Sequence, residues 1–191
     1  GCSLATDTEA LLRAPQLSGE SRALQKALNS YLNSAVTLKY PNSGDFLSPF
    51  AFGDWDGDGQ DEAAVLYAAD STGTNVWLAV LEAETDGGWR VSQTVEGLSG
   101  EVEVHLRDSV SQQLIAGYTS AQGDSYLVVY RYADGQLTTV ISQSYTHMIL
   151  ADFTGKGDTQ DLVLALPAET DFGGVALQLL TNMDGEFRSA Q

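Results

Sequence analysis

Apolar residues near the start of the chain recur at helical spacing. Ser18 is suited to cap a helix, and Glu20 would lie in the first turn, where a carboxylate favours the helix dipole. Beyond it, apolar side chains fall three or four positions apart, as on one face of a helix. These residues are Leu24, Leu28, Tyr31, Leu32 and Val36. The pattern predicts one amphipathic helix packed against the domain that follows.

Residues 36–40 alternate between apolar and polar, which predicts a strand that ends at Pro41–Gly44. The N-terminal section 18–44 is therefore expected to hold one helix and one strand. One possible position for this strand is an edge left open by the last unit of the repeats described next.

From residue 45 onward the strand-like segments repeat. An apolar run leads to an Asp-Gly pair three times, at Asp86, Asp134 and Asp184, which are 48 and 50 residues apart. Asp-Gly favours tight hairpin turns because both residues tolerate positive φ. A second marker has a similar period: Glu62–Leu66 matches Asp161–Ala165, with Gln113–Gly117 in the corresponding place between them.

A period near 48 with four short strands in each unit predicts blades of a β-propeller. The expected fold is mainly β: an array of about three four-stranded blades at 45–97, 98–145 and 146–191, preceded by one α-helix. Propellers typically close with four to eight blades, so three units predict an incomplete one. A fragment of a longer protein, two combining chains and an open array of sheets all remain compatible with the sequence.

The loop of the first unit carries a metal-ligand pattern. Asp54, Asp56 and Asp58 alternate with other residues, and Glu62 follows at position nine. Their side-chain oxygens, with the backbone carbonyl of Gln60, suit a hard cation, and Ca²⁺ is the expected ion. Position nine rather than twelve is acidic and a strand-like run follows, so the loop is not an EF-hand.

The corresponding loops differ in charge. In the third unit, Asp152–Asp161 keeps the first Asp and the glycines, but Lys156 replaces a carboxylate. Because ligand charge sets Ca²⁺ affinity, we expect this loop to be free of metal. The second-unit loop, 108–112, has lost the pattern.

Phe52–Gly59 and its downstream copies resemble the FG-GAP/VCBS repeat family, whose members include the calcium-bearing blades of integrin α-subunit propellers and many secreted bacterial proteins. The resemblance covers about residues 45–191, and it is specific in the first unit, partial in the third and weak in the second. It implies a calcium-stabilised extracytoplasmic module and no reaction. Residues 11–45 resemble the opening of uncharacterised lipoproteins from Gram-positive bacteria.

The composition limits the range of expected cellular locations and binding partners. The 191 residues include 26 acidic and 9 basic ones, and the formal net charge of -17 disfavours nucleic acid and anionic lipid headgroups as partners. The lone cysteine, Cys2, resembles the lipidated residue of a bacterial lipobox, and residues 1–17 read as a lipid-anchor and tether segment. We therefore expect a cell-surface lipoprotein, held at the membrane only through Cys2.

The residues indicate binding more than catalysis. No nucleophile elbow or HExxH motif is present, and no catalytic residue is predicted. The favoured hypothesis is a binding or adhesion module with an unidentified protein or glycan ligand at the cell surface. The alternative is a carbohydrate-active enzyme that uses paired carboxylates. Trp55 is expected to cover the neighbouring sheet, although an exposed Trp beside Ca²⁺ could stack on a sugar.

Overall fold

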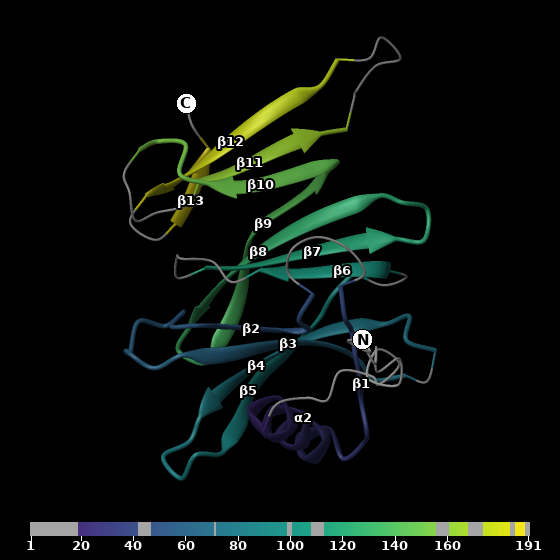
Figure 1. Ribbon diagram of the computed structural model, residues 1–191, viewed down its shortest axis with the longest axis vertical. Coiled ribbons are helices and arrows are strands. Elements are labelled where there is room, and N and C mark those ends of the chain that lie inside the picture. Colours follow the sequence, from purple (N-terminus) through teal and green to yellow (C-terminus); the bar gives the residue numbers. More distant parts are fainter. Residues whose placement is uncertain are drawn as a thin grey trace, which may run out of the picture.

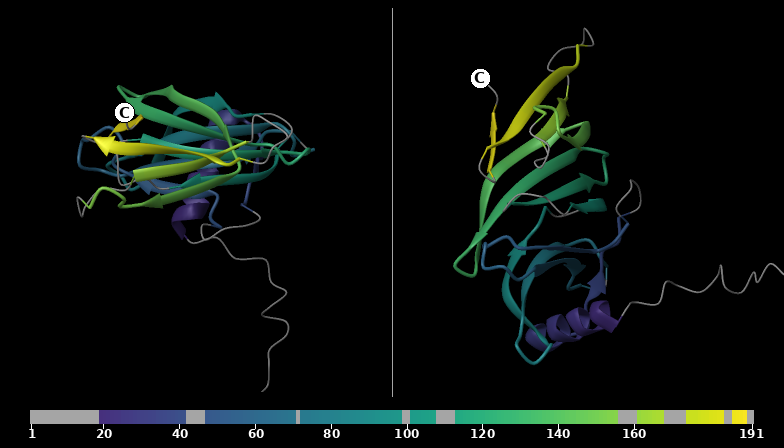
Figure 2. Two further views of the ribbon diagram at one scale, coloured as in Figure 1. Left: turned by 90° about the horizontal axis from the view of Figure 1, so that it is seen from above. Right: turned by 60° about the vertical axis from the view of Figure 1, so that its left-hand side comes forward.

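The fold is mainly β, with one N-terminal helix and three antiparallel sheets (Figure 1). The computed structural model describes residues 19–41, 47–70, 72–98, 101–107, 113–155, 161–167, 174–183 and 186–189, of which 101–107 are described by their backbone alone. The helix and the sheets follow one another along the long axis of the molecule (Figures 1 and 2). The three sheets do not close into a ring.

Helix α2 spans Gly19–Leu32. Leu24 and Leu28 are fully buried, as the helical spacing predicts, and they contact the first sheet. The helix ends where Asn33 takes a left-handed conformation with φ of 51°, a common way to stop a helix. The side-chain oxygen of Asn29 then accepts a hydrogen bond from the Val36 N–H at 3.0 Å, which turns the chain toward the sheet.

The first sheet has the order β1-β3-β4-β5, with β2 paired to the same edge of β3 as β1. Its strands are β1 Thr37–Leu38, β2 Phe50–Gly53, β3 Glu62–Ala68, β4 Val76–Ala83 and β5 Trp89–Glu96. The expected strand at 36–40 is reduced to β1. The expectation that it adds to the last unit is wrong, because Leu38 pairs with Tyr67 of β3.

The second and third sheets are four-stranded meanders, in which each strand pairs with the next along the chain. The second contains β6 Glu101–Arg107, β7 Gln113–Ser120, β8 Ser125–Ala133 and β9 Gln136–Tyr145. The third contains β10 His147–Ala151, β11 Asp161–Leu166, β12 Ala176–Met183 and β13 Glu186–Ser189. The predicted unit boundaries, after 97 and after 145, fall between strands of different sheets.

Three apolar layers hold this stack together. One lies between α2 and the first sheet, one between the first and second sheets, and one between the second and third. Strand β3 is buried along its whole length because both of its faces are covered, and its sequence is correspondingly an almost continuous apolar run. Ala63, Val65 and Tyr67 face the helix, whereas Ala64 and Leu66 face the second sheet.

The Asp-Gly turns differ from one another. Asp134 and Gly135 both have positive φ, 52° and 71°, so β8 and β9 are joined by the tight hairpin that the sequence predicts. Between β4 and β5 only Gly87 has positive φ, and the connection is longer. There the Asp86 carboxylate caps the turn instead, by accepting the Gly88 N–H at 2.9 Å. Residues 184–185 lie outside the described residues.

Candidate metal centre

The acidic loop connects β2 to β3 and is organised by its own carboxylates. Asp54 accepts the N–H groups of Gly57 at 2.8 Å and Gly59 at 3.0 Å. Asp56 accepts the Asp58 N–H at 3.0 Å. The two glycines have φ of 79° and 89°, in the left-handed region that a residue with a side chain seldom adopts. Alternating carboxylates and glycines thus curl this segment around its own acidic side chains.

The structure brings four of the five predicted ligands together. One carboxylate oxygen from each of Asp54, Asp56, Asp58 and Glu62 lies within 4.8 Å of the others. An all-oxygen donor set of this charge fits a hard divalent cation such as Ca²⁺. The fifth predicted ligand, Gln60, is exposed, and its N–H donates to Asp58 Oδ1 at 2.8 Å. The use of its carbonyl as a ligand stays a prediction.

Glu62 differs from the other three acidic residues because it is buried, with 3% of its surface exposed. It is the first residue of β3, and its Oε2 accepts the Trp55 N–H at 2.8 Å. Burial raises the pKa of Glu62 to about 7, and the negative charges of Asp56 and Asp54 act in the same direction. A cation among these carboxylates would favour the ionised form of Glu62.

Trp55 lies inside the loop and is 1% exposed. Its ring belongs to the apolar layer between the first and second sheets. This confirms the expectation that Trp55 covers the neighbouring sheet, and its burial leaves no ring face on which a sugar could stack. Through this side chain the loop is fixed to the second sheet as well as to its own strands.

In each repeat unit a buried polar residue begins the second of the four repeated strands, which are β3, β7 and β11. These residues are Glu62, Gln113 and Asp161, the positions that the repeat aligns. The Gln113 side-chain oxygen accepts the Phe187 N–H at 2.9 Å, which joins the second sheet to the third. Sequence comparison of the units aligned these positions but did not predict their burial, which follows only from the stacking.

In the third sheet the corresponding carboxylate is already satisfied by the backbone. Asp161 accepts N–H groups of Phe153 at 3.0 Å, Thr154 at 2.9 Å and Asn182 at 2.9 Å. Burial alone would raise the pKa of Asp161, but these hydrogen bonds outweigh it and hold the pKa below its ordinary value. Lys156 lies outside the described residues, so the prediction that this loop is free of metal stays a prediction.

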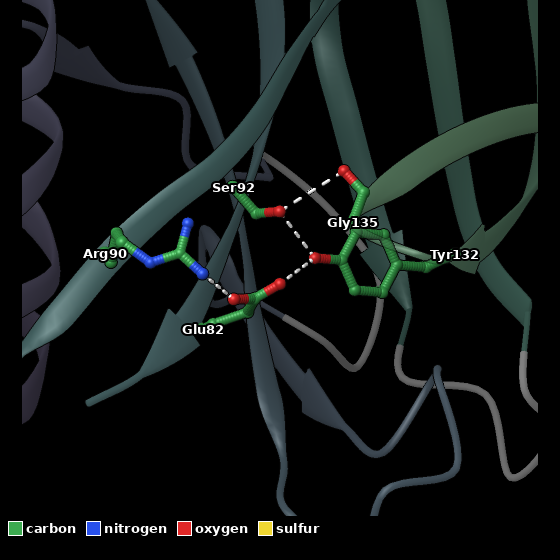
Figure 3. Close-up of polar contacts among 5 residues, drawn as sticks. All are labelled: Glu82, Arg90, Ser92, Tyr132 and Gly135. Atoms are coloured by element: carbon green, nitrogen blue, oxygen red, sulfur yellow. Dashed lines mark hydrogen bonds and ion pairs between the residues drawn. The ribbon is translucent and has the colours of Figure 1, made fainter. Parts of the chain in front are cut away.

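A polar network beside the loop joins the first sheet to the second (Figure 3). The Tyr132 hydroxyl donates to Glu82 Oε1 at 2.6 Å and lies 2.7 Å from Ser92 Oγ. Ser92 donates in turn to the Gly135 carbonyl at 3.2 Å, and Arg90 forms an ion pair with Glu82. Burial raises the pKa of Tyr132, and the adjacent Glu82 carboxylate raises it further, so the phenol stays protonated.

The sequence alone does not predict this network. The pairing of Tyr132 with Glu82 joins residues 50 positions apart. The only signal in the sequence is a polar aromatic residue, Tyr132, within the apolar strand β8. Its partner, Glu82, depends on which sheets are adjacent.

A small cavity of about 210 Å³ adjoins the acidic loop where the three sheets approach one another. Trp55 and Asp56 line it on the loop side, and Gln113 and Tyr132 line it on the second sheet. An ion pair between Arg131 and Glu186 closes it toward the third sheet. The surroundings of the acidic loop are therefore contributed by all three sheets.

Compared with protein-family models, curated proteins and solved structures, the chain gives no significant match. Cys2, the predicted lipidation site, lies outside the described residues. In the part of the chain that is described, no helix has the length and apolar character needed to cross a bilayer.

Proposed function

We propose that the protein is an extracytoplasmic, lipid-anchored β-repeat module of the FG-GAP/VCBS type, in which Ca²⁺ stiffens a scaffold that binds a ligand. The observation that carries this proposal is the convergence of Asp54, Asp56, Asp58 and Glu62 within 4.8 Å. Without a cation, four carboxylates at this separation repel one another, by about 1 kcal/mol per pair in water and more near a protein surface. Bound Ca²⁺ would offset this repulsion, because each carboxylate would be attracted to the cation.

The position of the loop explains how calcium would stabilise more than the loop itself. Glu62 begins the buried strand β3, and Trp55 packs between two sheets. A cation held by the loop would therefore fix the start of a central strand and the contact between the first and second sheets. In this proposal the three sheets are propeller-like blades, and the ligand, a protein or a glycan, binds to the surface they form.

Calcium titration of the purified protein tests the metal site. Because a ligand that binds only the native state stabilises it, we expect millimolar Ca²⁺ to raise the melting temperature and a chelator to reverse the change. Asp56→Asn keeps the Oδ1 acceptor for the Asp58 N–H and removes one ligand charge. This variant should bind Ca²⁺ at least about tenfold more weakly by calorimetry.

The matched control is Asp61→Asn, which removes the same charge one position before Glu62. Asp61 is exposed and is not one of the four converging residues. If Asp56→Asn and Asp61→Asn weakened Ca²⁺ binding equally, the effect of calcium would come from the overall negative charge and not from a specific site. A melting temperature that changes with neither calcium nor chelator would contradict the proposed metal site.

The cell-surface part of the proposal rests on Cys2. Lipidation there predicts that the protein fractionates with membranes and that Cys2→Ser releases it to the soluble fraction. Equal fractionation of the two proteins would contradict the anchor.

The alternative of a carbohydrate-active enzyme requires two carboxylates about 5 to 10 Å apart in a concave site away from the calcium loop. Among the four cavities lined by described residues, only the one beside the loop contains two carboxylates. They are Asp56, from the metal cluster, and Glu186, which is paired with Arg131. A hydrolysis screen run beside a glycan array would distinguish the two functions.

A further inference from the structure

The third sheet carries an apolar outer face that no described element covers (Figures 1 and 2). Ile149, Val163 and Leu179 lie side by side across β10, β11 and β12. The next row consists of His147, Ala165 and Leu177, of which His147 is polar and exposed. Ile149 and Leu177 are 55% and 71% exposed. An apolar sheet face of this kind normally lies against another layer.

The repeat shows what covers the same face elsewhere in the chain. Leu78, Leu127 and Leu177 occupy equivalent places in β4, β8 and β12, the third strands of the three repeat units. Leu78 is fully buried against the second sheet and Leu127 is fully buried against the third, whereas Leu177 is exposed. In both buried cases the covering layer is a four-stranded antiparallel sheet.

Neighbouring positions follow the same rule. Ala64 in the first sheet and Ile115 in the second are fully buried, and the equivalent Val163 in the third is only partly buried. The outer face therefore continues the chain's own sheet-on-sheet interface with the covering layer missing. Its residues are apolar, like the equivalent residues that pack against a sheet twice in the same chain.

We propose that two copies of this chain associate face to face through the outer face of β10–β13. The residues that we place in this contact are Ile149, Val163, Leu177 and Leu179. A second copy supplies a four-stranded sheet with an open apolar face, although the covering face within the chain is the opposite face of the next sheet. Apolar sheet faces are self-complementary because they pack about 10 Å apart without needing paired charges.

Charge does not oppose the contact locally. The chain has a formal net charge of -17, yet the exposed charged side chain of β13 is Arg188. Glu186, a neighbouring carboxylate, forms ion pairs with Arg188 and with Arg131. The long-range repulsion between two acidic chains remains, and salt screens it. Association should accordingly strengthen as the salt concentration rises.

The small size of the face limits how strongly two copies are expected to associate. Four strands spaced about 4.8 Å apart, each about six residues long at 3.3 Å per residue, give a face of about 19 by 20 Å. Two such faces bury about 760 Å² in total, below the about 1,200 Å² of standard specific interfaces and in the range of weak, transient contacts. The dimer should therefore be weak and reversible, with a dissociation constant above about 1 µM.

Analytical ultracentrifugation in a reducing buffer, which prevents crosslinking through Cys2, tests the proposal. Between about 1 and 300 µM the wild-type mass should rise from one chain toward two. Leu177→Asp places a carboxylate within the apolar face and should weaken the dimer at least about tenfold. Since Leu177 is 71% exposed, this variant should fold normally, which circular dichroism at low concentration checks.

The matched control is Val140→Asp, which adds the same charge at a 41% exposed apolar position on β9 of the second sheet. It should change the dissociation constant by less than about twofold. A wild-type chain that stays monomeric over the whole range would overturn the proposal and leave the face to a different partner. Equal weakening by both variants, or assembly beyond a dimer, would also overturn it.

Discussion

Glu62 shows how one buried carboxyl group can have opposite effects on stability in two states. Its pKa of about 7 lies well above the ordinary value near 4.5, because the side chain is buried among other acidic groups. A carboxyl whose pKa is higher in the folded state lowers the stability of that state once the pH exceeds its unfolded value. With Ca²⁺ bound, the same charge becomes a ligand.

The effect of Glu62→Gln on the melting temperature should therefore have opposite signs with and without calcium. In a chelator at pH 8 we expect the variant to melt at the same temperature as the wild type or a few degrees above it, since Gln can still accept the Trp55 N–H. In millimolar Ca²⁺ it should melt below the wild type. Differential scanning calorimetry in the two buffers measures both shifts, and a deficit of equal size in each would contradict a metal role for Glu62.

Asp161 behaves in the opposite way, because backbone hydrogen bonds favour its ionised form. A carboxyl whose pKa is lower in the folded state contributes stability above its unfolded value, near 3.8, and loses it as the pH falls through the folded value. Asp161→Asn keeps one side-chain oxygen as an acceptor, so its amide N–H₂ would face at least one of the three N–H donors. We expect a loss of about 2 kcal/mol at pH 7 that shrinks below pH of about 4.

Urea unfolding at several pH values measures this loss, with Asp124→Asn as the control. Asp124 is exposed in the turn that precedes β8 and should show a difference of less than about 0.5 kcal/mol at any pH. A deficit in Asp161→Asn that stays constant down to pH 3 would mean that packing, rather than charge, makes Asp161 important.

Among the elements, the connection between β5 and the second sheet shows how closely the sheets approach. The Gly97 N–H donates to the Val76 carbonyl at 2.8 Å. A Cβ atom added at Gly97 would lie 2.7 Å from a ring carbon of Tyr118 and 3.0 Å from the Val76 carbonyl oxygen. Tyr118 is fully buried, so its ring has little room to move aside.

Gly97→Ala should accordingly destabilise the protein by about 1 to 3 kcal/mol, the usual cost of overpacking. Gly174→Ala is the control, because a Cβ there meets nothing within 4 Å and φ is not in the left-handed region. Denaturant unfolding of the two variants compares them. Equal stabilities would show that the first and second sheets can separate locally at no measurable cost.

The elements also show where sequence reasoning succeeds. Alternation and Asp-Gly turns are local signals, so the strands and the hairpin at Asp134 were predictable. The partner of a strand is not local, which is why Leu38 joins β3 against one expectation. Tyr31 fits the apolar spacing of α2, yet it is 53% exposed because it lines a groove that α2 forms with Trp89 of β5.

For the metal centre, spacing along one short loop predicted the cluster of four carboxylates, because the loop is too short to separate them. The surroundings depend on contacts far apart in sequence. The bonds from Tyr132 to Glu82 and from the Phe187 N–H to Gln113 span 50 and 74 residues. No local pattern specifies such partners until the order of the sheets is known.

At the scale of the whole molecule, the two ends of the stack differ. Helix α2 covers the first sheet, so the apolar layer at that end is closed, and Leu28 is fully buried in it. At the other end the outer face of β10–β13 is open, and Leu177 is 71% exposed. A leucine is therefore fully buried at one end of the molecule and mostly exposed at the other.

Truncation of the two leucines measures this asymmetry directly. Leu28→Ala should cost about 2 to 4 kcal/mol, because it leaves a cavity between the helix and the first sheet. Leu177→Ala should cost less than about 0.5 kcal/mol in the monomer, since its side chain is already in water. Urea unfolding at about 1 µM, below the expected dimer range, isolates the monomer. A large cost for Leu177→Ala under these conditions would mean that its face is covered within the chain itself.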